Sequence, residues 1–421
     1  MQNPKVLTFI MAGGKGERLY PLTKDRAKPA VPFGGKYRLI DFPLSNCINS
    51  QLRQIYVLTQ YKSDSLNRHL FNGWGMFRGE QEFIYPIPAQ QRTGEDWYQG
   101  TADSIRQNKH LIERSHPDLV LILAGDHIYK MDFRQFFKFH YEKKASVTIS
   151  AIGVDKEKAR NNLGVIEADS DGRVIGFEEK PAEPKTIPND PQRCYSSMGV
   201  YVINPNTLLE MLAMEGDDFG KNLIPQKVKK GNGVYSYNFS ENNSIKDFVY
   251  ITNKEGERIR EDVKKAPDSS YWKDVGSIDE FWKANMDLVQ VSPEFNLYSR
   301  WKIQTYQEQA PPSKTVFQEP DRRGVALDSL VSDGVIISGA TVIRSILSSG
   351  VYVHSMAKLA ESVVFNNVEI GRNAEIINTI IDKDAKIPKG MRIGYDLEED
   401  RKRGFTVTDS GIVVVPKGYG N

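Results

Sequence analysis

Cysteine is scarce in this chain, because Cys47 and Cys194 are the only thiols among its 421 residues. Two cysteines cannot build the disulfide framework that stabilises small secreted domains. They also lack the short spacing of a structural zinc site. The sequence therefore excludes a protein held together by disulfides or zinc, and it indicates a reducing, cytoplasmic environment.

Neither sign of charge dominates, and long apolar runs are missing. Lys and Arg together number 56 and Asp and Glu 54, so the formal net charge is only +2. This balance argues against a nucleic-acid partner bound through bulk basicity. No apolar run approaches the roughly 20 residues that span a bilayer, so no membrane partner is expected. The stretch 6–12 is short and runs into glycines, which indicates a buried strand and not a signal peptide.

Residues 1–290 alternate short aliphatic runs with segments of helical pattern. Both kinds of element are predicted there, with strands over 6–11, 55–59, 119–123 and 147–152 and helices over 63–71, 101–113 and 132–143. Such alternation is typical of βαβ units, so we expect a Rossmann-like α/β domain with a mixed, mostly parallel sheet. Asp171-Gly172 lies between 164–168 and 173–179, which predicts an added antiparallel hairpin.

Residues 326–421 carry a different pattern. One aliphatic residue recurs every five or six positions, at Val331, Ile337, Val342, Leu347, Val353, Leu359, Val364, Ile370, Ile376, Ile381, Ile387 and Ile393. An α-helix would give gaps of three or four residues. The period therefore predicts a left-handed parallel β-helix of hexapeptide repeats, with small or polar corner residues at Gly339, Gly350, Asn367 and Gly371. A loop-rich β-sandwich with chance spacing is the alternative.

The segment 291–325 separates these two regions. It contains Pro311-Pro312 and Pro320 and shows little periodicity. We expect an interdomain connection there.

Glycines follow the first predicted strand directly, in the run Ala12-Gly13-Gly14-Lys15-Gly16. Such a loop lets backbone N–H groups approach a phosphate closely. It differs from a P-loop, which ends in Gly-Lys-Ser or Gly-Lys-Thr. Arg18 and Lys28 add two cations that could neutralise a triphosphate, although in isolation each can equally be a solvated surface charge.

Two aspartates are candidate magnesium ligands. Asp126 follows the apolar run 121–124, and ligands of open α/β sheets bind outside the carboxyl ends of strands. Asp274 is the second candidate, in Trp272-Lys273-Asp274-Val275-Gly276. Mg²⁺ usually takes one or two protein carboxylates together with substrate phosphates. A turn or a helix cap is the alternative role for each aspartate.

Charged and aromatic residues at other strand ends complete the candidates. Lys180 could bind a monoester phosphate and Glu179 could accept hydrogen bonds from sugar hydroxyls, with an ordinary charged strand end as the alternative. His127 has no partner at metal-ligand spacing, so a structural hydrogen bond is predicted for it. No nucleophile motif is present, and no covalent intermediate is expected.

These motifs, in this order, resemble the signature of the nucleotide-sugar pyrophosphorylases. The signature begins with Gly13-Gly14-Lys15-Gly16-Glu17-Arg18-Leu19 and continues with Arg26-Ala27-Lys28-Pro29-Ala30. Further runs narrow the resemblance to the glucose-1-phosphate adenylyltransferase (ADP-glucose pyrophosphorylase) family, at 45–50, 97–103, 124–129, 179–181 and 272–276. The resemblance covers nearly the whole chain, including the C-terminal repeats.

The resemblance implies a Mg²⁺-dependent reaction of ATP with α-D-glucose 1-phosphate that gives ADP-glucose and pyrophosphate. In the family the sugar phosphate attacks the α-phosphorus of ATP in line, at the committed and allosterically regulated step of glycogen or starch synthesis. Positioning and charge neutralisation carry such catalysis, which suits the cations and carboxylates above. A pyrophosphorylase that uses another nucleotide and a non-catalytic regulatory subunit are the alternatives.

The resemblance also implies roles for individual residues. Arg18, Lys28 and Asp126 would be catalytic, and Asp126 with Asp274 would hold Mg²⁺. The nucleotide would contact Gly13, Gly14, Lys15, Gln60, Trp97, Gly100 and Thr101. Glucose 1-phosphate would contact Tyr98, Gly164, Glu179, Lys180, Ser197, Asp218, Phe219 and Trp272, with Lys180 taking its phosphate.

Regulation and assembly are implied in the same way. Family members are usually homotetramers that respond to a sugar-phosphate or glycerate-phosphate effector, and Arg38 and Arg372 are the implied effector contacts. Branches activated by fructose 1,6-bisphosphate carry a lysine and a histidine where this chain has Asp25 and Pro32, which disfavours that activator. Residues 240–270 are longer and more charged than the equivalent stretch of typical bacterial members, which predicts a solvated insertion.

Overall fold

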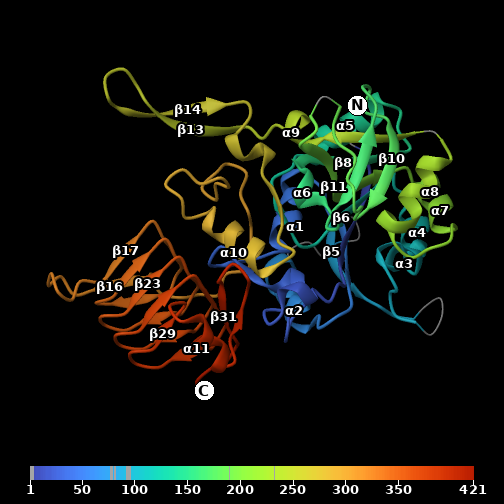
Figure 1. Cartoon of the computed structure of the whole chain (residues 1–421). Helices are drawn as coiled ribbons and strands as arrows, with labels where there is room; N and C mark the ends of the chain where they lie inside the picture. The colour runs from blue at the N-terminus through green and yellow to red at the C-terminus, as the bar shows by residue number, and fades with distance from the viewer. Residues whose placement is uncertain (1–3, 76–78, 80–81, 92–95, 189, 232) are drawn as a thin grey trace.

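The computed structural model describes residues 4–75, 79, 82–91, 96–188, 190–231 and 233–421. Figure 1 shows an N-terminal α/β unit beside a C-terminal β-helix, which carries the orange and red end of the chain. The two predicted architectures, an α/β sheet domain and a parallel β-helix, are both confirmed. Among the described helices, none has the length and apolar character needed to cross a membrane.

In the described part of the chain, nine strands form the main sheet. Its order is β10 (Val174–Glu179), β9 (Gly164–Ala168), β11 (Arg193–Ile203), β6 (Leu119–Ala124), β1 (Val6–Ala12), β4 (Gln54–Thr59) and β5 (Phe83–Pro88), while β8 (Val147–Asp155) pairs with β11 and β12 (Val234–Asn238). The four strands predicted from aliphatic runs all lie in this sheet. β1, β4, β5 and β6 run parallel, and β9 and β10 form the predicted antiparallel hairpin.

Helices cover the sheet where amphipathic segments were predicted, with one difference. Residues 101–113 do not form one helix but split into α3 (Thr101–Arg106) and α4 (Lys109–Ser115). The cause is Asn108, whose side-chain amide donates to the Ser104 carbonyl oxygen at 2.8 Å and to the Tyr98 hydroxyl at 2.9 Å. Asparagine side chains that bond locally in this way compete with the helical backbone.

The other described helices are short. They are α1 (Asp41–Asn49), α2 (Asp64–Trp74), α5 (Phe133–Glu142), α6 (Lys156–Ala159), α7 (Pro205–Leu212), α8 (Ile224–Lys229), α9 (Phe239–Asn242), α10 (Ile278–Met286), α11 (Leu397–Lys402), the 3₁₀ turns η1 (Glu17–Leu19), η2 (Lys28–Ala30) and η4 (Pro267–Ser270), and the π-turn η3 (Phe219–Leu223). Asp132 caps the first turn of α5 by accepting the Arg134 N–H at 3.1 Å. Acidic caps of this kind fix where a helix begins.

The C-terminal unit is a three-sided coil. The first parallel sheet contains β16 (Lys314–Val316), β19 (Ile336–Ser338), β22 (Tyr352–Val353), β25 (Glu369–Ile370) and β28 (Lys386–Ile387). The second contains β17 (Val325–Leu327), β20 (Thr341–Ile343), β23 (Lys358–Ala360), β26 (Glu375–Ile377) and β29 (Arg392–Ile393). The third contains β18 (Leu330–Val331), β21 (Ile346–Leu347), β24 (Val363–Val364), β27 (Thr379–Ile381) and β31 (Val413–Val415), with β30 (Thr406–Val407) antiparallel to β31. Eleven of the twelve predicted aliphatic positions belong to one buried cluster, and Val331 packs against it. The hexapeptide period therefore identified the solenoid core.

The corners of the coil explain the predicted small residues. Gly339, Gly350 and Asn367 have φ values of 63°, 76° and 60°, in the left-handed region that most side chains avoid. Gly371 does not have positive φ, but an added Cβ there would lie 2.6 Å from the Ile387 carbonyl oxygen. The first solenoid strand, β16, lies inside the segment 291–325, so coil pairing begins before residue 326.

The β-helix packs directly against the α/β unit. One buried cluster joins Phe33 and Phe281 of the N-terminal region to Ile346 and Val363 of the solenoid. Polar contacts cross the same boundary. Trp282 Nε1 donates to the Glu361 carbonyl oxygen at 2.9 Å, and the Arg26 guanidinium lies 2.9 Å from the Asp382 carboxylate.

The predicted insertion forms a hairpin. β13 (Asp247–Thr252) pairs with β14 (Arg258–Val263) antiparallel, and most residues of this hairpin are exposed, as predicted. The prediction was wrong for the flanks of 240–270, where Asn243 and Ser269 are fully buried because they join the strand pair to the rest of the α/β unit. Figure 1 shows the hairpin extending away from both units. Short strands elsewhere are β2 (Pro32–Phe33) with β3 (Tyr37–Arg38), and β7 (His127–Tyr129) with β15 (Trp272–Asp274).

The Arg26–Asp382 pair gives a first prediction. Both side chains are nearly inaccessible to water, so Arg26→Met leaves an uncompensated carboxylate and is expected to lower the free energy of unfolding by about 3 kcal/mol. Chemical denaturation checks this. In the double variant Arg26→Met/Asp382→Leu the loss should be smaller than in the single variant. A double variant as unstable as the sum of its parts would contradict the role of this pair.

Candidate active site

The glycine loop leaves β1 and turns beneath Lys28. Gly16 has φ of 65°, and an added Cβ there would lie only 2.9 Å from the Cβ of Lys28. The Thr23 hydroxyl donates to the Gly16 carbonyl oxygen at 3.0 Å and fixes the turn. Glycine is thus required at residue 16 both by backbone conformation and by the close approach of η2.

The two candidate metal ligands lie together at the ends of one strand pair. Asp126 precedes β7, Asp274 ends β15, and the antiparallel register places Asp274 opposite His127. Lys28 Nζ lies 2.8 Å from Asp126 Oδ2 and 3.3 Å from Asp274 Oδ1. Three segments far apart in the sequence therefore bring one ammonium group and two carboxylates into contact.

Burial and charge act against each other in this cluster. Burial alone would lower the pKa of Lys28, but the carboxylates of Asp126 and Asp274 outweigh it and raise that pKa. Burial alone would raise the pKa of Asp126, but Lys28, and then His127, hold it below its usual value. The charged forms of Lys28 and Asp126 therefore persist in a site with little water.

A first cavity, which we call the loop cavity, has a volume of about 410 Å³. Backbone and side chains of the glycine loop border it, together with Lys28 and Asp126 of the ion-pair cluster. Its described lining is Met11, Ala12, Gly14, Lys15, Gly16, Glu17, Arg18, Lys28, Pro29, Asp126 and Gly276. Lys15 and Arg18 bring additional positive charge to its rim. The cavity can therefore hold a polyanion beside backbone N–H groups.

A second cavity, the strand cavity, has a volume of about 240 Å³ and adjoins the first, with Met11 and Arg18 lining both. Seven of the eight residues predicted to bind glucose 1-phosphate line it, namely Gly164, Glu179, Lys180, Ser197, Asp218, Phe219 and Trp272. Asp274 and Thr101 line it as well. The structure brings these residues together from β9, β10, β11, η3 and β15.

Polar contacts hold the floor of the strand cavity. Thr101 Oγ1 donates to Asp218 Oδ2 at 3.1 Å and accepts the Phe219 N–H at 3.0 Å. The Phe219 ring stacks on Tyr201 with centroids 5.8 Å apart. The Glu179 carboxylate lies so near residue 164 that a Cβ added to Gly164 would be 2.7 Å from its Oε2.

The charges around the mouth of this cavity are partly exposed. Burial is the main reason that the pKa of Glu179 is raised, with Lys180 opposing the shift and Asp218 adding to it. Lys180 has φ of 53° and an ammonium group 4.0 Å from Glu179 Oε1. A half-exposed lysine and a partly buried carboxylate can bind a phosphate and hydroxyl groups respectively.

Of the residues predicted to contact the nucleotide or the sugar phosphate, five line neither cavity in the part of the chain that the structure describes: Gly13, Gln60, Trp97, Tyr98 and Gly100. Gln60 and Tyr98 are bonded to each other, because the Gln60 amide donates to the Tyr98 carbonyl oxygen at 3.2 Å and accepts the Tyr98 N–H at 2.7 Å. A Cβ added to Gly13 would lie 3.3 Å from the Gln60 Cβ. Gln60 thus links Tyr98 to Gly13 of the glycine loop, whereas Gly100 lies against Asp217.

Sequence patterns did not point to some neighbours of the site. Asn162 Oδ1 accepts a hydrogen bond from Arg18 Nη1 at 2.8 Å, yet residues 161–163 carry no motif. His127 makes the predicted structural hydrogen bond, with Nδ1 lying 3.0 Å from the Met198 carbonyl oxygen. Its Nε2 lies 3.6 Å from Asp126 Oδ1 and 3.8 Å from Asp274 Oδ1, which only the strand pairing decides.

The two predicted effector residues lie apart. Arg38 lines a cavity of about 380 Å³ between the α/β unit and the β-helix, which we call the interdomain cavity. Lys383, which sequence patterns did not identify, lines it too, and burial followed by the charges of Arg38 and Arg26 lowers its pKa to about 8. Arg372 is exposed on the solenoid and is not among the described residues that line this cavity.

The carboxylate pair is compatible with a bound magnesium ion. Asp126 and Asp274 offer hard oxygen donors within reach of one cationic group, which marks a position where positive charge is favourable. No group of three or more His, Cys, Asp or Glu side chains within the described ranges could hold a metal without further ligands. Such a site suits Mg²⁺, which keeps waters and takes substrate phosphates as ligands.

Comparison with known proteins identifies the family of this chain. The Nucleotidyl transferase family model matches residues 7–291, and the model of the GlmU-like C-terminal hexapeptide matches residues 311–415. Glucose-1-phosphate adenylyltransferase of Rhodopirellula baltica is 46% identical over 98% of this chain and 90% of its own length. The protein of the same name from Nitrosospira multiformis is 48% identical over 97% of this chain and 93% of its own length.

A sheet domain with a glycine loop after β1, joined to a hexapeptide β-helix, defines a nucleotidyl transferase of the two-domain class. Identity of 46–48% over nearly full length then places the chain within that class. It belongs to the glucose-1-phosphate adenylyltransferase family.

Gly16 and Gly14 both line the loop cavity, and they give a prediction with an internal control. Gly16→Ala is expected to lower the free energy of unfolding by about 1–2 kcal/mol, because alanine must adopt positive φ and its Cβ would approach Lys28. Gly14→Ala is the control, because no atom lies within 4 Å of a Cβ built there, and its stability should stay unchanged. Urea denaturation compares the two variants, and equal losses would contradict the packing described here.

Proposed function

We propose that this protein transfers AMP from ATP to α-D-glucose 1-phosphate and produces ADP-glucose and pyrophosphate. One observation carries the proposal. The loop cavity and the strand cavity adjoin at Met11 and Arg18, and Asp126 lines the first while Asp274 lines the second. Two adjoining cavities with a charged cluster at their junction suit a reaction between a nucleotide and a sugar phosphate. The names of the relatives supply the substrates.

The nucleotide is expected in the loop cavity. Gly14 lets the backbone approach the phosphates, with Gly13 next to it in the loop, while Lys15 and Arg18 neutralise their charge. Gln60, Trp97, Gly100 and Thr101 would lie toward the base and ribose, which the contacts of Gln60 with the segment around residue 98 support.

Glucose 1-phosphate is expected in the strand cavity. Lys180 binds its phosphate as a point charge, and Glu179, Ser197 and Asp218 offer acceptors to the sugar hydroxyls. Phe219 and Trp272 supply apolar walls, and Gly164 leaves room for the ring. Tyr98 acts indirectly in this arrangement, since its hydroxyl is bound by Asn108.

The reaction then proceeds by positioning and charge neutralisation. An oxygen of the sugar phosphate forms a bond to the α-phosphorus, and the bond from that phosphorus to the bridging oxygen of pyrophosphate breaks. Arg18 and Lys28 neutralise the charge that grows on the phosphate oxygens. Asp126 and Asp274 would hold Mg²⁺, which when bound neutralises further phosphate charge. No side chain needs to form a covalent intermediate.

The boundary between the α/β unit and the β-helix is a suitable place for an effector site. We assign the binding of a sugar-phosphate or glycerate-phosphate effector to the interdomain cavity, where Arg38 and Lys383 supply positive charge. Arg372 would contact an effector only from outside this cavity. The flat faces of the β-helix favour packing against further copies, in keeping with a homotetramer. The two buried, free cysteines suit a reducing cytoplasm.

The proposed reaction has a direct test. The purified chain, with Mg²⁺ and glucose 1-phosphate, is expected to release pyrophosphate with ATP and far less with UTP, dTTP, GTP or CTP. The assay is repeated with fructose 1,6-bisphosphate and with 3-phosphoglycerate to identify the effector class. Faster pyrophosphate release with another nucleotide would show that ATP is not the substrate. No release with any nucleotide would favour a non-catalytic regulatory subunit.

The sugar-phosphate assignment predicts a split between the kinetic constants. Lys180→Ala is expected to raise the KM for glucose 1-phosphate at least about ten-fold and to leave the KM for ATP nearly unchanged, because the lysine lines only the strand cavity. Asp126→Asn is the contrasting variant and should lower kcat by orders of magnitude. Equal changes of both KM values in Lys180→Ala would refute the assignment.

A further inference from the structure

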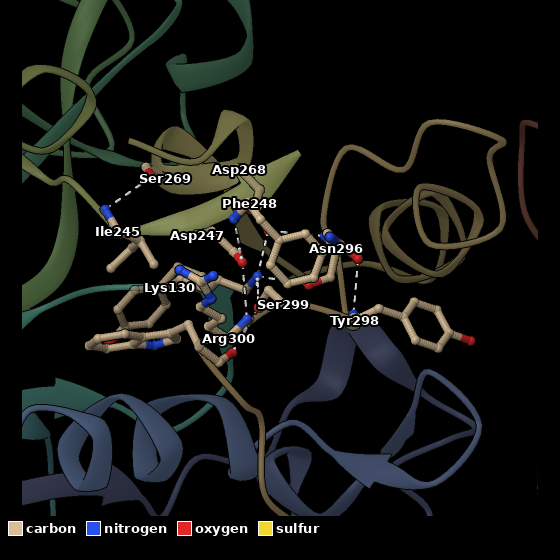
Figure 2. Close-up of polar contacts among 12 residues, drawn as sticks. Lys130, Ile245, Asp247, Phe248, Asp268, Ser269, Asn296, Tyr298, Ser299 and Arg300 are labelled. Carbon is tan, nitrogen blue, oxygen red and sulfur yellow. Dashed lines mark hydrogen bonds and ion pairs between the residues drawn. The ribbon is translucent and has the colours of Figure 1, made fainter. Parts of the chain in front are cut away.

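A lysine that the proposed chemistry does not use is completely buried near the active site. Lys130 is 0% exposed, and its ammonium group has three acceptors. It donates to Asp268 Oδ2 at 2.6 Å, to the Asn296 carbonyl oxygen at 2.7 Å and to Ser299 Oγ at 2.7 Å. Figure 2 shows Lys130 among Asp268, Ser299 and their neighbours. The three acceptors satisfy all three ammonium hydrogens.

The position of this ion pair relates it to the two candidate metal ligands. Lys130 directly follows β7, whose other end adjoins Asp126, and Asp268 lies in η4, just before β15, which ends at Asp274. Asp126 and Asp274 therefore lie at one end of the β7–β15 pair, and the Lys130–Asp268 ion pair lies at the other end. Because β7 and β15 have only three residues each, a shift at one end reaches the other.

A second side chain joins the same two segments. Asn243, which is fully buried, donates to the Lys130 carbonyl oxygen at 2.8 Å and to the Ser269 carbonyl oxygen at 2.7 Å. We call Lys130, Asp268 and Asn243 the strand clamp. Asn243 belongs to the insertion 240–270, so the insertion contributes directly to this end of the strand pair.

The clamp also contacts the start of the interdomain segment, and this segment in turn contacts the hairpin. Asp268 Oδ2 accepts the Asn296 N–H at 3.0 Å in addition to Lys130. A few residues further on, the Arg300 guanidinium makes two bonds to Asp262 of β14, at 2.6 and 3.1 Å. The Arg300 N–H donates to Asp247 Oδ1 at 3.1 Å. Figure 2 shows Asp268, Asp247 and Arg300 in one region with Asn296 and Ser299.

A buried charge pair is a costly way to fill this space. Desolvation opposes a buried ion pair, and apolar residues of similar volume often serve as well or better for stability. An ion pair with fully satisfied hydrogen bonds fixes the geometry of its surroundings, because its partners must keep fixed distances and directions. A role in positioning explains why charges occupy this interior location.

We propose that the strand clamp is a positioning device that holds Asp126 and Asp274 in register around Lys28. The proposal rests on the proposed function, in which these carboxylates hold Mg²⁺. Without the clamp, β15 can shift along β7, and the distance between the two carboxylates is no longer fixed. Displacements of about 1 Å in an active site can cost about 100-fold in rate.

Lys130→Met tests the proposal in the full-length protein, because methionine keeps the apolar volume but removes every donor. The expected result is a fall in kcat of at least about ten-fold with changes of less than about three-fold in both KM values. Hydrogen–deuterium exchange, which needs no substrate, is expected to rise in peptides covering 126–130 and 271–275. Asn243→Ala carries no change of charge and should give the same two effects if Lys130→Met does not fold.

Val234→Ala is the matched control, because it removes buried volume from β12, away from the clamp. It should lower the melting temperature without selective exchange at 126–130. Adding Asp268→Asn to Lys130→Met should cost little further turnover if the two residues act as a unit. The proposal is overturned if the clamp variants lose melting temperature but keep kcat, or if exchange in 126–130 and 271–275 stays unchanged. If the unaltered chain makes no ADP-glucose, the proposed function is refuted instead. Hydrogen–deuterium exchange in the clamp variants would still show whether the clamp holds β7 and β15 together.

Discussion

Lys28 lies between Asp126 and Asp274, and all three groups are largely withdrawn from water. In such a place each charge depends on the others, because an isolated buried charge would be strongly unfavourable. The glycine loop must turn closely beneath Lys28, which requires glycine at residue 16. The strands β7 and β15 must pair so that both carboxylates arrive at the same end. Much of the surrounding architecture serves this cluster.

The β-helix contacts the segment before Lys28 and the segment after Asp274. Arg26 lies two residues before Lys28 and is paired with Asp382 of the solenoid, while Lys383 lines the interdomain cavity. Phe281 and Phe365, with ring centroids 6.3 Å apart, pack the same boundary with apolar contacts. A solenoid of repeated coils gives a stiff support for such a contact, since each coil is held by its neighbours.

Differences between the expected and observed elements have local causes. The segment 101–113 has helical periodicity throughout, but Asn108 satisfies its side chain on Ser104 and Tyr98 and divides the helix. β16 carries no aliphatic repeat and was assigned to the connection, yet its backbone pairs with β19. Backbone pairing needs no particular side chain, so the repeat pattern could not reveal it. Similarly, Lys130 stands in an ordinary sequence, and only folding shows that it is buried.

The sequence by itself determined the regular parts of this protein: the strand–helix alternation, the hexapeptide core, the glycine loop and the candidates Arg18, Lys28, Asp126 and Asp274. These follow from short-range rules of periodicity and backbone freedom, which act over a few residues. Only the tertiary structure decided that the last three form one cluster, that Arg18 lines both cavities, and that Arg38 meets Lys383 but not Arg372 in the interdomain cavity. Such contacts join segments 98 or more residues apart, since Lys28 and Asp126 are separated by 98 positions. Strand order and register, which local patterns do not encode, set their distances.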